Sequence, residues 1–247
     1  MRATETIYGL HAVRVMLERH PSRVVRVRVA ERRENSRVRL IEALAQRQQR
    51  PIERIAMHSL RQLLGNVAHQ GVAADITPLP PWSEDELLAA LPGAAAPLLL
   101  ALDGVQDPHN LGACLRTADA CGALAVVVPR DRAAQLTPTV RKVAVGAAET
   151  TPVVAVTNLV RSLRMLKDTG LWVVGADAAG AKLAQQVDLR GPVVLVLGGE
   201  GTGMRHLTQQ YCDFTVRLPQ LGAVESLNVS VAAGMLLYEA VRQRENS

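Results

Sequence analysis

The chain has 247 residues, enough for one large domain or two modest ones with hydrophobic cores of their own. Hydrophobic residues make up 48% of it and charged residues 21%, which excludes a disordered, collagen-like or coiled-coil chain. The net charge is +5, but residues 1–80 hold 14 arginines and 7 acidic residues, net +7, while residues 81–247 hold 14 basic and 16 acidic residues, net −2. This asymmetry indicates either an N-terminal part that approaches nucleic acid or an arginine-rich solvated surface.

Aromatic and cysteine residues are both scarce. One Phe, three Tyr and two Trp leave little for recognising single-stranded nucleic acid by stacking. The three cysteines, Cys114, Cys121 and Cys212, form no CxxC pair, which argues against a disulfide framework or a zinc site. No apolar run approaches the length of a membrane span. We therefore expect a soluble cytoplasmic protein with no metal and no membrane partner.

Residues 1–76 have the pattern of a small, basic α/β domain. Alternating valines and arginines predict a strand over 24–29, and further strands are predicted over 52–57 and 71–77. Apolar residues at helical spacing predict helices over 36–50 and 59–67. Residues 77–97 hold five of the thirteen prolines and are predicted to be a linker. Within it, Ser83 and Glu86 form a capping-box pattern that predicts one short helix.

Residues 98–247 alternate between continuous apolar runs and helical patterns. Such runs are typical of strands buried on both faces, so the alternation predicts a parallel α/β sheet with helices on both sides. Ligands of such sheets bind at the carboxyl ends of the strands. The predicted strands are 98–102, 123–129, 151–157, 171–177, 191–198 and 214–219, and the helical segments are 111–121, 137–149, 158–168, 203–212 and 228–244.

The loop and helix after the first of these strands contain three candidate site residues. Asn110 stands where a helix N-cap would, Gly112 would leave room for a substrate one turn before Arg116, and Arg116 lies off the apolar stripe. The structural alternative is that Asn110 only caps the helix, Gly112 allows close helix packing and Arg116 pairs with Asp119 on the surface.

Two further loops follow later strands. GGEGTGM, residues 198–204, has four glycines that let the backbone approach a ligand closely, and Glu200 is its one charged residue. It lacks the spacing of a dinucleotide or P-loop motif. Ser226 and Asn228 precede the last helix, where they either cap it or belong to a ligand loop opposite the glycine loop.

In this order and at this spacing, the three motifs resemble those of the SpoU (TrmH-like) RNA ribose 2′-O-methyltransferases. The matching blocks are N-L-G-x-x-x-R-T-A at 110–118, G-x-E-G-x-G-M at 198–204 and S-L-N-V-S-V-A at 226–232. IYGLHAV at 7–13 and HQGVAADI at 69–76 are similar to the substrate-binding module of the bacterial branch that modifies a guanosine of large-subunit ribosomal RNA.

The resemblance implies a SPOUT-type parallel sheet with a C-terminal trefoil knot over 98–247, preceded by a small L30e-like RNA-binding domain over 1–76. It implies a homodimer with active sites at the subunit interface and S-adenosyl-L-methionine as cofactor. The cofactor-binding residues it implies are Gly198, Leu218 and Leu227. The catalytic residues it implies are Asn110, Arg116, Glu200, Ser226 and Asn228.

The implied reaction is methyl transfer to the ribose 2′-hydroxyl of a guanosine in the peptidyl-transferase region of 23S ribosomal RNA. An arginine guanidinium stays protonated in proteins, so we expect Arg116 to orient the hydroxyl and stabilise the developing alkoxide. The alternatives are the same chemistry on transfer RNA or another ribosomal site, and an RNA-binding homologue without catalytic activity.

Overall fold

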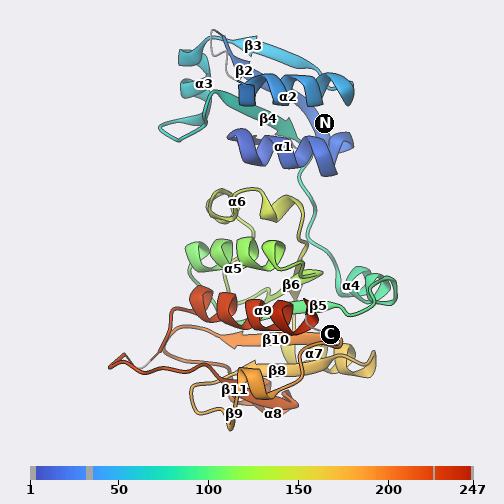
Figure 1. The fold of residues 1–247 in the computed structure, drawn as a ribbon, viewed down its shortest axis with the longest axis vertical. Coiled ribbons are helices and arrows are strands. Elements are labelled where there is room, and N and C mark those ends of the chain that lie inside the picture. The colour runs from blue at the N-terminus through green and yellow to red at the C-terminus, as the bar shows by residue number, and fades with distance from the viewer. Residues whose placement is uncertain (1–3, 32–35, 225, 246–247) are drawn as a thin grey trace. The chain divides into compact units, whose positions relative to one another are not determined.

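The computed structural model describes residues 4–31, 36–224 and 226–245. Its contacts divide the chain into two compact units, Met1–Leu79 and Pro80–Ser247, each with its own sheet (Figure 1). Within the described ranges, no helix is both long and apolar enough to cross a membrane.

The first unit is a four-stranded mixed sheet in the order β1-β4-β2-β3, with β2 and β3 parallel and the other neighbours antiparallel. Because side chains alternate along a strand, Val27 and Val29 pack with α1 and α2 on one face, while Ala30 and Ala73 pack with Leu60 of α3 on the other. The elements are β1 (Glu5–Tyr8), α1 (Leu10–Arg19), β2 (Val24–Ala30), α2 (Ser36–Arg47), β3 (Ile52–Ile55), α3 (Met57–Leu64) and β4 (Val72–Ile76).

The predicted strands and helices of this unit are present, but β1 and α1 are not among the predicted elements. Helix α1 buries Ala12, Val13, Met16 and Leu17, whose spacing is that of one helix face. That spacing was the signal that could have identified it.

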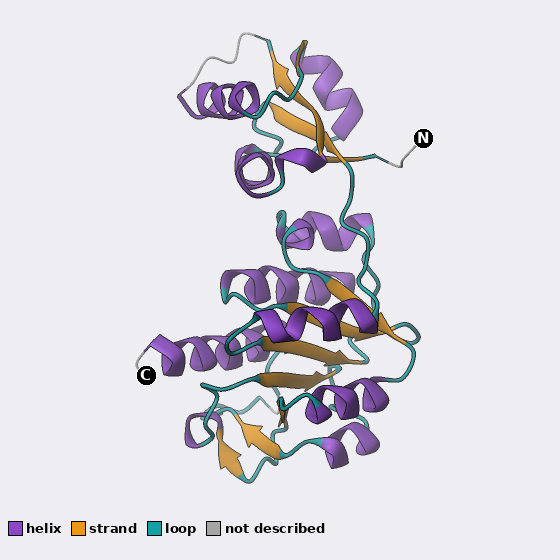
Figure 2. Cartoon of the chain, turned by 90° about the vertical axis from the view of Figure 1, so that its right-hand side faces the viewer, coloured by secondary structure: helices purple, strands orange, loops and turns teal. Residues whose placement is uncertain are grey.

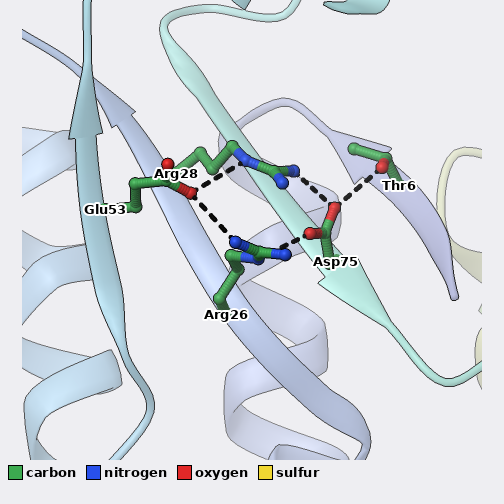
Figure 3. A network of polar contacts seen from close by, with 5 residues as sticks. All are labelled: Thr6, Arg26, Arg28, Glu53 and Asp75. Carbon is green, nitrogen blue, oxygen red and sulfur yellow. Dashed lines mark hydrogen bonds and ion pairs between the residues drawn. The ribbon is translucent and has the colours of Figure 1, made fainter.

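A network of charged side chains joins all four strands (Figure 3). Asp75 of β4, whose side chain is 8% exposed, accepts hydrogen bonds from Thr6 Oγ1 of β1 at 2.8 Å and from Arg28 of β2. Arg26 Nε lies 2.8 Å from the other oxygen of Asp75. Both arginines also donate to Glu53 Oε2 of β3, Arg28 from its Nε at 3.2 Å and Arg26 from its Nη1 at 3.4 Å. Burial raises the pKa of Asp75, but the hydrogen bonds from Arg28 and Thr6 and the positive charges outweigh it and lower that pKa overall.

We expect Asp75→Asn to destabilise the first unit by about 1–3 kcal/mol at neutral pH, because charged hydrogen bonds are lost at a buried position. A carboxyl whose folded pKa is lowered stabilises above its unfolded pKa of about 3.9, and this contribution is lost as the pH falls through the lower folded pKa. The difference from wild type should therefore shrink below about pH 4.

Hydrogen exchange of the β4 amides in the full chain, at pH 7 and at pH 3, measures this difference. Glu53→Gln is the matched control, because Glu53 is 45% exposed and exposed ion pairs contribute little. An equal effect of the two substitutions would contradict the central role of Asp75.

The second unit is a seven-stranded parallel sheet in the order β7-β6-β5-β10-β8-β11-β9. Figure 2 shows helices on both sides of it. Leu111 of α5, Val140 of α6 and Val229 of α9 belong to the core on one face, and Leu163 of α7 belongs to the core on the other. The elements are α4 (Glu84–Ala90), β5 (Leu98–Asp103), α5 (Pro108–Ala120), β6 (Ala125–Pro129), α6 (Pro138–Ala144), β7 (Val153–Val156), α7 (Leu159–Asp168), β8 (Trp172–Ala176), β9 (Lys182–Leu183), β10 (Val193–Gly198), α8 (His206–Tyr211), β11 (Phe214–Arg217) and α9 (Val229–Glu245).

The predicted parallel sheet with helices on both faces is confirmed. The two-residue strand β9 is an addition, too short for any periodicity to show. The helical segment predicted over 137–149 is interrupted after Ala144, because Val145 and Gly146 both adopt left-handed backbone conformations and a 3₁₀ turn follows. The trefoil knot implied by the resemblance stays a prediction.

Most of the predicted linker is structured as part of the second unit. The backbone N–H of Trp82 donates to Val153 O of β7 at 3.0 Å, and Leu87 and Leu91 are buried in the core beside α7. The capping box is confirmed, with Glu86 N donating to Ser83 Oγ at 3.2 Å. This part of the predicted linker therefore packs on the sheet of the second unit.

Candidate active site at the carboxyl edge of the parallel sheet

The site lies where the loops after two neighbouring strands meet. Strands β5 and β10 pair in parallel with Asp103 opposite Gly198, so both strands end at the same edge of the sheet. Helix α5 begins after the first loop and carries Asn110, and the glycine loop with Glu200 follows the second. Helix α9, which packs beside α5, begins directly after Asn228 (Figure 1).

Three predicted residues form one hydrogen-bonded group at this junction. Glu200 Oε1 accepts from Asn110 Nδ2 at 2.9 Å and from Asn228 Nδ2 at 2.6 Å. Asn228 Nδ2 also lies 3.0 Å from Asn110 Oδ1. Asn110 is buried, with 7% of its surface exposed, while Glu200 and Asn228 are exposed. Residues 110, 200 and 228, far apart in sequence, therefore fix one another's orientation at the sheet edge.

The helix starts show which of these residues act as caps. Asp107 is the N-cap of α5, accepting from His109 N at 2.9 Å, and Pro108 is the first helical residue. The capping alternative for Asn110 is therefore wrong, because this residue lies inside the helix and its side chain is engaged by Glu200. Asn228 does both, since its Oδ1 accepts from Ser230 N at 2.9 Å while its amide group faces Glu200.

The position of Gly112, one turn before Arg116, predicted that it leaves room for a substrate. This prediction is wrong. Gly112 is buried against α6, where an added Cβ would lie 2.6 Å from Val143 Cβ and 2.9 Å from Val140 O. Its role is close packing of α5 on α6, which is the structural alternative weighed for it.

Arg116 is exposed on α5, six residues beyond Asn110. The alternative pairing of Arg116 with Asp119 is not formed, and Asp119 instead accepts from Thr150 and Thr151. Among the described residues, the Arg116 side chain has no hydrogen bond or ion pair and is not joined to the Asn110–Glu200–Asn228 group.

The glycine loop turns back sharply after β10. Gly203 N donates to Gly199 O at 3.0 Å, and the two residues form an isolated antiparallel bridge. A Cβ at position 198 would lie 1.9 Å from Gly203 C and 2.0 Å from Met204 N, so only glycine fits there. This turn brings the backbone of 198–204 to the rim of a pocket.

That pocket has a volume of about 500 Å³ and lies at the carboxyl ends of β8, β10 and β11. All three predicted cofactor residues line it, together with Glu200 and Ser226. Ser226 is exposed and forms no hydrogen bond within the described part of the chain. Asn110 and Asn228 meet the pocket through Glu200. The predicted residues in the lining are Gly198, Glu200, Leu218, Ser226 and Leu227.

Sequence reasoning missed Asp103, which anchors both ends of the glycine loop. Its carboxylate is fully buried, and its Oδ2 accepts from Arg205 N at 2.8 Å, while its backbone carbonyl accepts from Gly199 N at 3.0 Å. Its Oδ1 has no hydrogen bond among the described residues and lies 3.6 Å from Arg205 Nε. The sequence signal for Asp103 was an acidic residue at the end of the apolar run LLLALD. Ligands of parallel sheets bind at the carboxyl ends of the strands, so a charged residue there is a candidate site residue.

Cys114 and Cys212 supply no nucleophile to this site. Burial raises the pKa of Cys114 to about 12, and burial with the nearby Asp213 charge raises that of Cys212 to about 12. Both therefore stay thiols at neutral pH. The described residues include no cluster of three or more His, Cys, Asp or Glu suited to a metal ion. The arrangement offers a cofactor-sized pocket beside a cluster of amide, carboxylate and hydroxyl groups.

We expect Glu200→Gln to lower the single-turnover rate of the reaction at this site by about tenfold. Glutamine keeps one acceptor oxygen but loses the negative charge, which weakens both hydrogen bonds that Oε1 accepts from Asn110 and Asn228. Because Glu200 is exposed, the melting temperature should change little. A rate equal to that of wild type would contradict the orienting role, and a large drop in melting temperature would show a structural one.

Comparison with known proteins gives consistent matches over both units. Residues 97–238 match the SpoU rRNA Methylase family, and residues 6–82 match the family described as RNA 2'-O ribose methyltransferase substrate binding. The chain is 54% identical over 248 residues to the 23S rRNA (guanosine-2'-O-)-methyltransferase RlmB of Pseudomonas syringae pv. tomato, covering 99% of this chain and 98% of that protein.

Two solved structures are also similar. The SpoU methyltransferase AviRb from Streptomyces viridochromogenes, in complex with the cofactor AdoMet, superimposes with a TM-score of 0.76 at 25% identity, covering 99% of this chain and 92% of that one. The A. aeolicus TrmH/SpoU tRNA modifying enzyme has a TM-score of 0.57 at 30% identity and covers 66% of this chain and 85% of its own. The family model spans more than half of the chain and the first relative nearly all of it, so the protein belongs to the SpoU rRNA methylase family.

Proposed function

We propose that the protein transfers a methyl group from S-adenosylmethionine to the ribose 2′-hydroxyl of a guanosine in the peptidyl-transferase region of 23S ribosomal RNA. The observation that carries the proposal is the Asn110–Glu200–Asn228 group at the rim of the 500 Å³ pocket, built from the three motifs of the family. The choice of 23S RNA rests on the full-length similarity to RlmB. With 23S ribosomal RNA as its substrate, the protein would act in the cytoplasm.

The pocket fits S-adenosylmethionine in size and in the character of its lining. Ligand pockets of about 300–1,000 Å³ are usual, with apolar walls and a few polar groups. Leu197, Leu218 and Leu227 are apolar, and Gly198 also lines the pocket, at a position where a Cβ would overlap the backbone of Gly203 and Met204. When bound, the sulfonium of this cofactor supplies an electrophilic methyl group. We assign its binding to Gly198, Leu218 and Leu227, chiefly through backbone groups.

The chain itself must align the ribose and manage the charge that develops on its 2′-oxygen. Holding a nucleophile in line with the group it attacks supplies much of the rate of such transfers. We assign this alignment to Asn110, Glu200 and Asn228, whose mutual hydrogen bonds fix their orientation, and to the exposed hydroxyl of Ser226. Arg116, whose guanidinium has no partner among the described residues, would donate to the 2′-oxygen and stabilise its developing negative charge as the hydroxyl proton passes to solvent water.

A homodimer is the proposed assembly, with active sites at the subunit interface. Support comes from α9, where Val231, Met235 and Tyr238 are 51%, 41% and 65% exposed at the spacing of one helix face. Helix α5 beside it carries the exposed Arg116. Sedimentation equilibrium of wild type and of Tyr238→Glu tests the dimer, since a charge on this face should produce monomers.

We further propose that residues 1–76 gather the RNA and that residues 98–247 catalyse the transfer. The first unit matches a family model named for substrate binding and carries the excess positive charge. The A. aeolicus tRNA modifying enzyme, which covers only 66% of this chain, makes transfer RNA the second candidate substrate.

The test is an assay with isotopically labelled S-adenosylmethionine, unmodified 23S RNA fragments and unmodified transfer RNA. We expect label in 23S RNA, retained as a 2′-O-methylguanosine after digestion. Label only in transfer RNA would support the alternative substrate. RNA binding without measurable S-adenosylmethionine affinity would show a homologue without catalytic activity and overturn the proposal.

A further inference from the structure

The arginines of the first unit differ in whether they are free to bind a ligand. Some are engaged within the fold: Arg14, Arg26, Arg28 and Arg54 form ion pairs with carboxylates. The sheet-face network in Figure 3 balances two arginines against two acidic residues and so carries no net charge. Arg61 of α3 differs, because its side chain is exposed and has no ion pair or hydrogen bond among the described residues.

Arg61 lines an open hollow of about 790 Å³ formed by α3 and the loop that leads to β4. The lining contains no acidic residue and no Phe, Tyr or Trp. Besides Arg61, it offers the exposed side chains of Asn66 and Gln70. Gln70 Oε1 accepts from Leu10 N at 3.0 Å, which leaves the amide nitrogen of Gln70 as the group that can donate to a ligand. The full lining is Met57, Arg61, Gly65, Asn66, Val67, Ala68, His69 and Gln70.

The wall of this hollow is held in place before any ligand binds. His69 is buried, and its Nδ1 accepts from Gly71 N at 3.1 Å. Gly65, Gln70 and Gly71 have φ values of 73°, 54° and 81°, so the loop follows a tight path set by left-handed residues. A fixed surface loses less conformational entropy on binding than a mobile loop does.

We propose that this hollow is the RNA-binding site of the first unit, with Arg61 contacting a backbone phosphate and Asn66 and Gln70 donating to phosphate or ribose oxygens. A site with donors and one free cation, and without acidic groups, matches the acceptor-rich RNA backbone. Because the hollow has no Phe, Tyr or Trp and its one imidazole, that of His69, is buried, it recognises the RNA backbone and the 2′-hydroxyls, and not stacked bases. The proposal rests on the proposed function for its choice of RNA as ligand.

The fold supplies a matched control on the opposite face. Arg47 ends α2, is exposed, and likewise has no ion pair or hydrogen bond among the described residues. Helix α2 packs on the face of the sheet that holds Val27, whereas α3 packs on the face that holds Ala30. Arg61→Gln and Arg47→Gln therefore remove the same charge from opposite faces of one unit.

The experiment measures the affinity of the full-length variants for a 23S RNA fragment over a range of salt concentrations. Loss of one phosphate contact should reduce the slope of log K against log salt by about 1, and we expect this for Arg61→Gln only. Asn66→Asp, which adds a negative charge inside the hollow, should weaken binding several-fold more than Gln46→Glu, which adds one on the exposed surface of α2. Melting temperature and S-adenosylmethionine affinity, measured for each variant, verify folding.

Equal slopes for Arg61→Gln and Arg47→Gln, or equal effects of the two added acids, would overturn the site. If wild type methylates RNA while these pairs behave alike, the proposed function stands and this inference fails. If wild type binds RNA with the predicted difference but does not methylate it, the inference stands and the proposed function fails. Binding of an acidic protein in place of RNA at this hollow would also overturn it.

Discussion

Replacing Arg116 with alanine is expected to lower the single-turnover rate of RNA methylation by about 10²- to 10³-fold, the usual cost of removing a donor aimed at developing negative charge. The side chain is exposed and unpaired among the described residues, so its removal leaves no buried group without a partner. The melting temperature should therefore stay within a degree or two of wild type. A fall in rate without a fall in stability is the signature of a catalytic role.

Arg116→Lys separates charge from geometry. Lysine keeps the positive charge but lacks the planar, forked donor group of arginine. We expect this variant to remain at least about tenfold slower than wild type, because alignment of the hydroxyl depends on the fork. Near-normal single-turnover methylation by the lysine variant would contradict the role of guanidinium geometry.

The control for both substitutions is Arg190→Lys. Arg190 pairs with Asp188 before β10 begins, at the edge of the sheet opposite the glycine loop, and both side chains are more than half exposed. The Arg190→Lys variant should methylate RNA at the wild-type rate. Measuring all three variants at saturating cofactor and RNA removes differences in binding from the comparison.

Gly198→Ala is expected to weaken the binding of S-adenosylmethionine at least about tenfold. The added Cβ would lie 1.9 Å from Gly203 C and 2.0 Å from Met204 N, and these backbone atoms cannot move without shifting the loop. Displacing a site by about 1 Å can cost 10²-fold in rate, and here the pocket wall and Glu200 move together. Calorimetric titration should show at least a tenfold loss of cofactor affinity, and the methylation rate should fall further.

Gly191→Ala is the control at the other end of the same strand. Gly191 precedes β10, has no atom within 4 Å of an added Cβ and does not adopt a positive φ. The substitution should leave cofactor affinity and rate unchanged. Wild-type affinity in Gly198→Ala would show that the cofactor does not depend on this loop and would remove the pocket from the proposed function.

Sequence periodicity was sufficient to predict the α/β class of both units and the parallel sheet of the second. The runs that became β5 and β10 are continuous and apolar because those strands are buried on both faces, and burial of that kind is visible in composition. The capping box at Ser83 was equally local, since it depends on two residues three positions apart. The candidate site residues were predicted from the three motifs, which lie within the residues 97–238 that the family model matches.

Tertiary structure decided what each polar residue does. The sequence left open whether Asn110 only caps its helix, and only the approach of Glu200, ninety residues later, shows that its side chain joins the Asn110–Glu200–Asn228 group. Gly112 looked like space for a substrate, and only α6 shows that it packs against Val143. The anchoring role of Asp103 depends on the pairing of β5 with β10, which joins segments ninety-five residues apart.

The charge asymmetry of the sequence also does not show which charged side chains are paired. Counting residues gave a net charge of +7 for residues 1–80, but not which arginines are available to a ligand. Ion pairs with Asp75, Glu53 and Glu42 form between two strands or between a strand and a helix, so they follow from the fold and not from composition. The sequence by itself determined the class of fold, the family motifs and the total charge, because these depend on local pattern. The tertiary structure decided which side chains meet and which cations stay free, because both depend on contacts between distant parts of the chain.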